Sequence, residues 1–288
     1  KATIGKDIAR AALLLSDGEL VAIPTETVYG LAANAFDPDA VLRIFQVKQR
    51  PAFDPLIVHV HGRSQVEQVV SEVPVEAQAL MDRFWPGPLT LVLPKSPRVP
   101  DIVTSGLDTV GVRMPAHPMA LELLRSLDFP LAAPSANPFG YVSPTTAQHV
   151  TAQLGKDIPY VLDGGPCAVG VESTIIGWEE GLPVLFRPGG LPLERIEAVI
   201  GTVRPQVEHV LPVAPGMIEN HYAPSKPLVV GDMPALLGER TGMRIGVIAF
   251  RDRFEATRCE TLSPPATSAP PSPPTPDCPR CAGRISNG

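Results

Sequence analysis

Residues 24–59 decide the fold and read PTETVYGLAANAFDPDAVLRIFQVKQRPAFDPLIVH. The helical period of 39–49, between an apolar run at 20–24 and another at 56–60, predicts strand, helix and strand. Hydroxyls, two close cations and a histidine lie at strand ends and loops, where side chains face a cleft more often than on a solvated helix face. The stretch therefore predicts an α/β scaffold with a site for a charged small molecule.

Composition limits the class of protein. The chain has 288 residues, enough for one large or two modest domains, with 44% hydrophobic and 19% charged residues. Its net charge of -6 argues against a broad basic surface for nucleic acid. No apolar run reaches the roughly 18 to 20 residues of a membrane helix, and the start of the chain lacks the apolar core of a signal peptide. We expect a cytoplasmic protein with no membrane contact and, from four unevenly placed cysteines, reduced thiols.

Helix and strand patterns are mixed from residue 1 to about 201. Beyond the opening stretch, helices are predicted at 8–17, 75–84, 118–127, 145–154 and 193–200, and strands at 89–93, 110–114, 131–133, 174–178 and 184–187. Several strand pairs have no helix between them. This favours an α/β or α+β domain with a mixed sheet over a simple doubly wound fold.

The pattern changes after residue 201. Residues 202–226 lack a period and predict a linker. Residues 228–250 predict one strand at 228–231, a helix at 235–240 and a strand at 244–250, too little for an independent core. Eight prolines between Pro264 and Pro279 predict a disordered tail over 251–288. The tail cysteines, Cys278 and Cys281, lack the four ligands of a structural zinc site, so we treat the pair as incidental.

The sequence has no Walker-type phosphate loop, GxGxxG turn, nucleophile elbow or HExxH pair. It has short polar clusters instead, and each allows two interpretations. Thr25 and Thr27 flank Glu26 after a strand; their hydroxyls can bind an anion, although a helix cap is favoured from these residues alone. Lys48 and Arg50 can complement a helix dipole, but the proline that follows ends the helix, so both can point at polyphosphate.

Later clusters follow the same logic. His59, on an apolar strand, is either a core histidine or a substrate contact. Arg113 lies inside an apolar strand, and a buried charge there must be paired or must bind a ligand carboxylate. A proline-rich turn offers Ser135 and Asn137, which on composition alone is simply a turn. Further polar groups follow at turns and strand ends: Ser143, Glu172, Ser173 and Arg187.

The clusters form a specific ordered set: PTETVYGL, KQRP, PLIVHV, GVRMP, PSANPFG, DGG, ESTI and RPGG. Together they closely resemble the Sua5/YrdC/YciO family from near residue 8 to about 225, and APGMIENHYAP resembles the linker of its longer Sua5 branch. The resemblance implies a YrdC-like twisted mixed sheet with surrounding helices and a concave substrate cleft. It implies a catalytic domain over 1–201, a linker over 202–226 folding across the site, a partial Rossmann-like C-terminal domain over 227–250, and the tail.

The family's reaction condenses L-threonine, bicarbonate and ATP to threonylcarbamoyl-AMP and pyrophosphate, with Mg²⁺ accompanying the ATP. The product passes to the t6A transferase machinery, which modifies position 37 of tRNA, so contact with tRNA is expected to be indirect or weak. We expect a nucleotidyltransferase without a protein nucleophile. The resemblance does not fix any protein ligand of the metal.

The resemblance also assigns the two ends of the cleft. The catalytic groups would be Lys48, Arg50, Ser135 and Asn137. The ATP end would comprise those four together with Asp54, Thr109, Ser143, Arg187 and Tyr222. The threonine end would comprise Thr27, His59, Arg113, Ala133 and Ser173, with Arg113 gripping a carboxylate.

Two departures from the family and three rival functions stay open. Asp54 stands where the family commonly has Asn, which puts a carboxylate near phosphates, and similarity to the Sua5 C-terminal domain fades after about residue 250. The core also resembles double-stranded-RNA-binding domains, carbamoyl-transfer domains of hydrogenase maturation, and YciO-type nucleotide binders without synthase activity. Acidic charge weakens the first, missing acylphosphatase and zinc-finger segments weaken the second, and the KxR and SxN pairs weaken the third.

Overall fold

The computed structural model describes residues 1–51, 54–205, 228–249, 254 and 258–261. The chain divides into two compact units, Lys1–Ser225 and Lys226–Gly288, and each is described by itself. Within the described residues, no helix has both the length and the apolar character needed to cross a membrane. The predicted linker and tail fall almost entirely outside the described residues, as does Tyr222.

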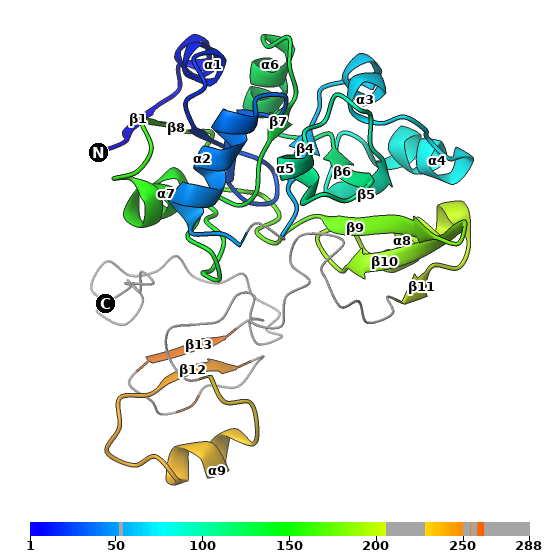
Figure 1. The fold of residues 1–288 in the computed structure, drawn as a ribbon. Helices are drawn as coiled ribbons and strands as arrows, with labels where there is room; N and C mark the ends of the chain where they lie inside the picture. The colour runs from blue at the N-terminus through cyan, green and yellow to red at the C-terminus, as the bar shows by residue number, and fades with distance from the viewer. Residues whose placement is uncertain (52–53, 206–227, 250–253, 255–257, 262–288) are drawn as a thin grey trace, which may run out of the picture. The chain divides into compact units, whose positions relative to one another are not determined.

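The first unit is built on one mixed sheet (Figure 1). Its eleven strands are β1 (Thr3–Gly5), β2 (Val21–Ile23), β3 (Gly30–Asn34), β4 (Ile57–His59), β5 (Leu89–Pro94), β6 (Thr109–Arg113), β7 (Leu131–Ala132), β8 (Tyr160–Leu162), β9 (Thr174–Glu179), β10 (Leu182–Arg187) and β11 (Arg204–Pro205). They lie in the order β1-β8-β2-β3-β7-β4-β6-β5-β9-β10-β11. Parallel pairs such as β4 with β6 alternate with antiparallel pairs such as β5 with β6, which confirms the predicted mixed sheet.

Helices surround this sheet (Figure 1). They are α1 (Ile8–Ser16), α2 (Pro38–Lys48), α3 (Arg63–Val69), α4 (Val75–Phe84), α5 (Asp101–Thr104), α6 (Pro118–Arg125), α7 (Ala147–Leu154) and α8 (Leu193–Ile200). Helix α1 packs on α6, α2 on α5, and α4 on α8. The packing of helices against a sheet is typical of α/β architectures.

Two apolar cores lie on opposite faces of β2 and β3. Val21 and Ile23 belong to a cluster with α1 and α6, whereas Ala22 between them packs into the larger cluster on the other side. Successive side chains of a strand point to opposite faces of the sheet. A short run that is apolar at every position can therefore be buried on both faces. This explains why residues 21–23 are all fully buried.

Helix α2 places the KxR cluster. Asp37 caps its start by accepting the backbone N–H groups of Asp39 and Ala40. The helix ends at Lys48, and Gln49 takes the left-handed conformation with φ 51°. The chain therefore turns sharply between the two cations, so Lys48 leaves from the last helical turn and Arg50 from the loop that follows.

Helices α3 and α5 and strands β1, β3, β8 and β11 were not predicted from the sequence, and two predicted features are absent from the described residues. Residues 25–29 form no helix: Thr25 caps a tight turn through the N–H groups of Thr27 and Val28, and strand β3 follows at once. Strand β3, GLAAN, was not predicted because most of its residues are small and none is β-branched. A strand predicted at 228–231 is absent from the structure described there.

The second unit contains three described elements. Helix α9 (Met233–Gly238) is capped by Asp232, and β12 (Gly246–Ala249) pairs in parallel with β13 (Arg258–Thr261). The helix and β12 lie within two residues of the predicted helix and strand.

Substitution of Leu91 tests the packing of β5. Strand β5 lies between β6 and β9, and the Leu91 side chain is fully buried in the larger apolar cluster. Leu91→Ala leaves a cavity there and is expected to lower the free energy of unfolding by about 2 to 5 kcal/mol. Leu13→Ala, at a position 62% exposed on α1, is the matched control and should change it by no more than about 0.5 kcal/mol. Urea unfolding measures both; equal effects would contradict the assigned core.

Candidate functional site

One cavity gathers most of the polar clusters. Its wall is made by the turn before β3, the end of α2, strands β4 and β6, the segment after β7, the residues before β9 and the end of β10. The residues that line it are Thr25, Val28, Gly30, Arg50, Ile57, His59, Arg113, Ala133, Pro134, Ser135, Glu172, Ser173 and Arg187. Seven of the predicted site residues are thus brought together from segments far apart in the chain.

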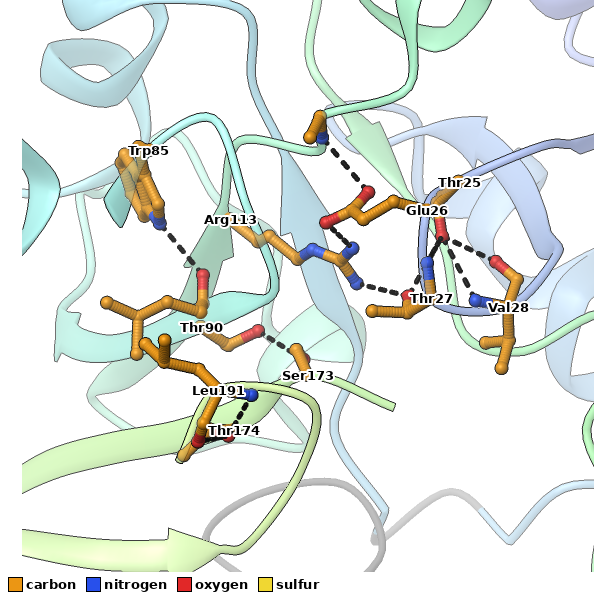
Figure 2. Close-up of polar contacts among 12 residues, drawn as sticks. Thr25, Glu26, Thr27, Val28, Trp85, Thr90, Arg113, Ser173, Thr174 and Leu191 are labelled. Atoms are coloured by element: carbon orange, nitrogen blue, oxygen red, sulfur yellow. Dashed lines mark hydrogen bonds and ion pairs between the residues drawn. The ribbon is translucent and has the colours of Figure 1, made fainter. Parts of the chain in front are cut away.

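The guanidinium group of Arg113 is held in place by the PTET turn (Figure 2). Arg113 Nη1 donates to Thr27 Oγ1 at 2.9 Å, and Nη2 lies 2.5 Å from Glu26 Oε1. Glu26 Oε2 also accepts the backbone N–H of Ala116 at 2.9 Å. No described residue accepts from Arg113 Nε, which is buried. The charge of the guanidinium group is therefore compensated by Glu26.

His59 is a neutral group beside Arg113. Strands β4 and β6 are parallel and in register, with His59 opposite Arg113, and the histidine is 3% exposed. Burial and the neighbouring guanidinium lower the pKa of His59 from 6.5 to about 3. The imidazole therefore carries no charge near neutral pH and can only offer a neutral hydrogen bond to a substrate.

Ser173 is fixed by two buried partners. Its hydroxyl lies 2.8 Å from Thr90 Oγ1 on β5, as Figure 2 shows. Arg187 Nη2 donates to the Ser173 carbonyl at 2.9 Å and to its hydroxyl at 3.2 Å. Ser173 and Arg187 were predicted at opposite ends of the cleft, and the structure links them directly.

The segment 133–137 is attached to the sheet by backbone hydrogen bonds. Ala133 N–H donates to the Ile57 carbonyl, and Ala136 N–H donates to the Tyr29 carbonyl. Lys48 Nζ donates to the Ser135 carbonyl at 2.5 Å and also to the Asn137 carbonyl. These bonds hold Ser135 and Ala133 on the cavity wall.

Lys48 is not exposed to the cavity in this structure. It is 1% exposed, and burial with the nearby Arg50 cation lowers its pKa well below the usual value. The sequence analysis assigned Lys48 to phosphate, whereas its ammonium contacts in the structure are the two carbonyls of the 135–137 segment. The reason is physical: α2 brings the side chain under a loop whose carbonyl groups need donors.

Asp54 pairs with Arg50 and does not line the cavity. Arg50 Nη2 lies 2.8 Å from Asp54 Oδ2, and the same guanidinium donates to the carbonyls of Asp54 and Pro55. The Asp54 carboxylate is fully buried, which raises its pKa, while the surrounding cations, Arg50 first, oppose that shift. The predicted direct contact with ATP therefore has no support from the cavity wall.

Four other predicted residues lie off the wall. Thr27 is fully buried, and its hydroxyl accepts from Arg113. Thr109 begins β6 opposite Pro94, at the other end of the strand from Arg113. Ser143 is next to the wall and donates to Glu172 Oε1 at 2.5 Å. Asn137 is 2% exposed, and its amide nitrogen donates to the carbonyls of Pro138 and Tyr141. Its role in the structure is to hold the turn.

Sequence reasoning missed three polar groups of the site. Glu26 and Glu172 belong to recognised clusters but received no role, because a carboxylate among anion-binding residues had no evident partner. Thr90 gave no signal at all, since it is one hydroxyl within the apolar strand LTLVLP. Contacts between β5 and β9 that explain Thr90 are visible only in three dimensions.

Comparisons with known proteins agree on one family. A family model described as "Telomere recombination" (Sua5/YciO/YrdC) matches residues 13–189, and one for the threonylcarbamoyl-AMP synthase C-terminal domain matches 191–276. Threonylcarbamoyl-AMP synthase of Pyrococcus abyssi is 54% identical over 78% of this chain and 67% of its own length. The Bacillus subtilis enzyme of that name is 46% identical over 85% and 75%.

Solved structures give the same result. Sua5 of P. abyssi complexed with L-threonine has a TM-score of 0.84 and 47% identity, covering 90% of this chain and 81% of its own. YciO of E. coli has a TM-score of 0.61 at 22% identity, covering 68% of this chain and all of its own, and shows the fold alone. The YrdC-like fold expected from the sequence is confirmed.

Removal of the Glu26 charge tests the buried ion pair. Glu26→Gln leaves Arg113 without a counter-ion and is expected to lower the free energy of unfolding by about 3 to 5 kcal/mol. The exposed pair of Arg63 and Glu67 is the control, because Glu67→Gln should cost at most about 1 kcal/mol. Chemical denaturation of both variants is the measurement. A similar small loss in both would contradict the claim that Arg113 depends on Glu26.

The lowered pKa of His59 predicts an acid dependence of stability. Between the ordinary value of 6.5 and the folded value of about 3, the unfolded chain binds the proton and the folded chain does not. The contribution of neutral His59 to the free energy of unfolding is therefore fully present above pH 6.5. It is lost as pH falls below this value, by up to about 1.4 kcal/mol per pH unit. Unfolding free energies of wild type and His59→Gln at pH 7 and pH 4.5 measure it. Between pH 7 and pH 4.5 the unfolding free energy of the wild type should fall more than that of His59→Gln. Identical decreases would contradict the lowered pKa of His59.

Proposed function

The chain belongs to the Sua5/YrdC/YciO family, and we propose that it makes threonylcarbamoyl-AMP and pyrophosphate from L-threonine, bicarbonate and ATP. The observation that carries the proposal is the cavity itself. Three arginines, Arg50, Arg113 and Arg187, line it together with a neutral His59. Such a wall suits two anionic substrates at once, an amino-acid carboxylate and a polyphosphate.

The two ends of the cavity divide the substrates. Arg113, with Thr27 and Ser173 close by, is the end for threonine, since a single guanidinium matches a single carboxylate. Arg50 and Arg187 form the phosphate end together with Ser135. Relatives named threonylcarbamoyl-AMP synthase, and a neighbour solved with L-threonine, support threonine as one of the substrates.

In this reaction the protein would position the substrates and stabilise negative charge. Threonine and bicarbonate would form N-carboxy-threonine, whose carbamate oxygen attacks the α-phosphorus of ATP while pyrophosphate leaves. Negative charge grows on the phosphate oxygens, and the fixed guanidinium groups of Arg50 and Arg187 would stabilise it. Both are already held by backbone carbonyls, so little reorganisation is needed when the charge develops.

Magnesium would enter as part of the nucleotide. The described residues contain no group of three His, Cys, Asp or Glu side chains that could hold a metal. In nucleotide sites the ligands of Mg²⁺ are usually phosphate oxygens and water. When bound, the ion would neutralise charge on the departing pyrophosphate.

The product would pass to a t6A transferase that acts on tRNA. A net charge of -6 suits a protein whose contact with tRNA is indirect.

Product formation tests the proposal. Purified protein with ATP, Mg²⁺, L-threonine and bicarbonate should release pyrophosphate and yield the mass of threonylcarbamoyl-AMP. Arg50→Ala should lower the rate about 10²- to 10³-fold, because a fixed cation at the phosphate end is lost. Arg43→Ala, an exposed cation on α2, is the control and should leave the rate unchanged.

Asn137→Ala should also lower the rate, since the turn that presents Ser135 loses its amide bonds. Equal pyrophosphate release without threonine, or no product mass, would overturn the synthase function and favour a nucleotide-binding relative.

A further inference from the structure

Glu172 is the one carboxylate among the described residues that line the cavity. The same wall carries three guanidinium groups, which suit carboxylate and phosphate but would repel an ammonium group. We propose that Glu172 binds the α-ammonium group of L-threonine and accepts its proton as the amine attacks the bicarbonate carbon. This inference rests on the proposed function and adds a catalytic residue to it.

A proton acceptor is required because threonine is a zwitterion and its ammonium nitrogen has no lone pair. The guanidinium groups stay protonated and have no acceptor to offer. His59 is neutral and buried beside Arg113, where a second positive charge is disfavoured. Lys48 lies off the wall and donates to two carbonyls. Glu172 is the remaining titratable group among the described residues of the wall.

The Glu172 carboxylate is held in a defined position. Its backbone carbonyl accepts the N–H of Gly190 at 2.8 Å. A Cβ on Gly189 would lie 2.5 Å from that carbonyl oxygen, so this glycine allows the turn after β10 to close on the segment. Ser143 donates its hydroxyl to Oε1 at 2.5 Å, and no described residue contacts Oε2. One oxygen is thus anchored, and the other is available to an ammonium group.

Glu172 is also close to the threonine end. It directly precedes Ser173, whose hydroxyl and carbonyl contact Arg187 and whose hydroxyl contacts Thr90. An α-amino acid held at its carboxylate by Arg113 would present its ammonium group within the same cavity wall. The pairing of one cation and one anion with the two charges of the zwitterion fixes its orientation.

The proton transfer balances. One N–H bond of the ammonium group breaks and an O–H bond forms at Glu172. The freed lone pair forms the N–C bond to bicarbonate, whose hydroxyl leaves as water with a second proton of the amine. Threonine, bicarbonate and the carboxylate thus become N-carboxy-threonine, water and a protonated Glu172, which later releases its proton to solvent.

Glu172→Gln tests the role, since it keeps the shape and removes the charge. The variant is expected to bind L-threonine about tenfold to a hundredfold more weakly by calorimetry. Its affinity for 2,3-dihydroxybutanoate, which has a hydroxyl in place of the amine, should stay the same. The rate at saturating threonine should fall about 10²- to 10⁴-fold, as for loss of a general base. Glu72→Gln, an exposed carboxylate between α3 and α4, is the control and should match wild type.

Several results would overturn the inference. Unchanged threonine affinity and rate in Glu172→Gln would do so, as would weaker binding of both ligands. A raised Mg²⁺ requirement for ATP binding with normal threonine affinity would make Glu172 a metal contact instead. If the variant does not fold, the affinities of the wild type for the two ligands still test the inference. Equal affinity for threonine and for the hydroxy acid would exclude an ammonium site. Wild type that binds no threonine would refute the proposed function itself.

Discussion

The buried guanidinium of Arg113 is the constraint on which the rest of the site depends. A cation that is 4% exposed inside a sheet must have a counter-ion and hydrogen-bond acceptors. The PTET turn supplies both through Glu26 and Thr27, and it can reach Arg113 because β2 and β3 form a hairpin around it. The turn therefore cannot be a helix start. Its shape is set by a charge that lies more than eighty residues away in the chain.

At the proposed phosphate end, several buried cations likewise need a counter-ion. Lys48, Arg50 and Arg187 all contribute to the electrostatics around Asp54, and the carboxylate is buried among them. An aspartate there reduces the mutual repulsion of the cations without entering the cavity. This accounts for an acid at a position near phosphate: it faces the protein, while Arg50 and Arg187 line the wall.

The sequence predicted the elements that carry strong patterns and the residues that stand out chemically. Buried strands such as β2 and β5 were found because all or nearly all of their positions are apolar. His59, Arg113 and Arg187 were found because polar groups in apolar strands are unusual. Strand β3 was not found, since small residues have no strong preference. The roles of Lys48 and Asp54 could not be predicted, because they depend on which carbonyl and which cation the fold brings within reach. Thr90 shows the same limit, as its partner lies 83 residues away.

Preorganisation links the two ends of the cavity. Arg187, at the proposed phosphate end, donates to both the carbonyl and the hydroxyl of Ser173, at the proposed threonine end. Ser173 is also bonded to Thr90, and the turn after β10 closes on the preceding residue. These polar groups are thus oriented by one another before any substrate arrives. The conformational entropy of their side chains is lost on folding and not on binding. A reaction that joins two substrates needs their reacting atoms aligned at the same moment. A continuous network from the phosphate end to the threonine end meets that need better than two independent pockets would.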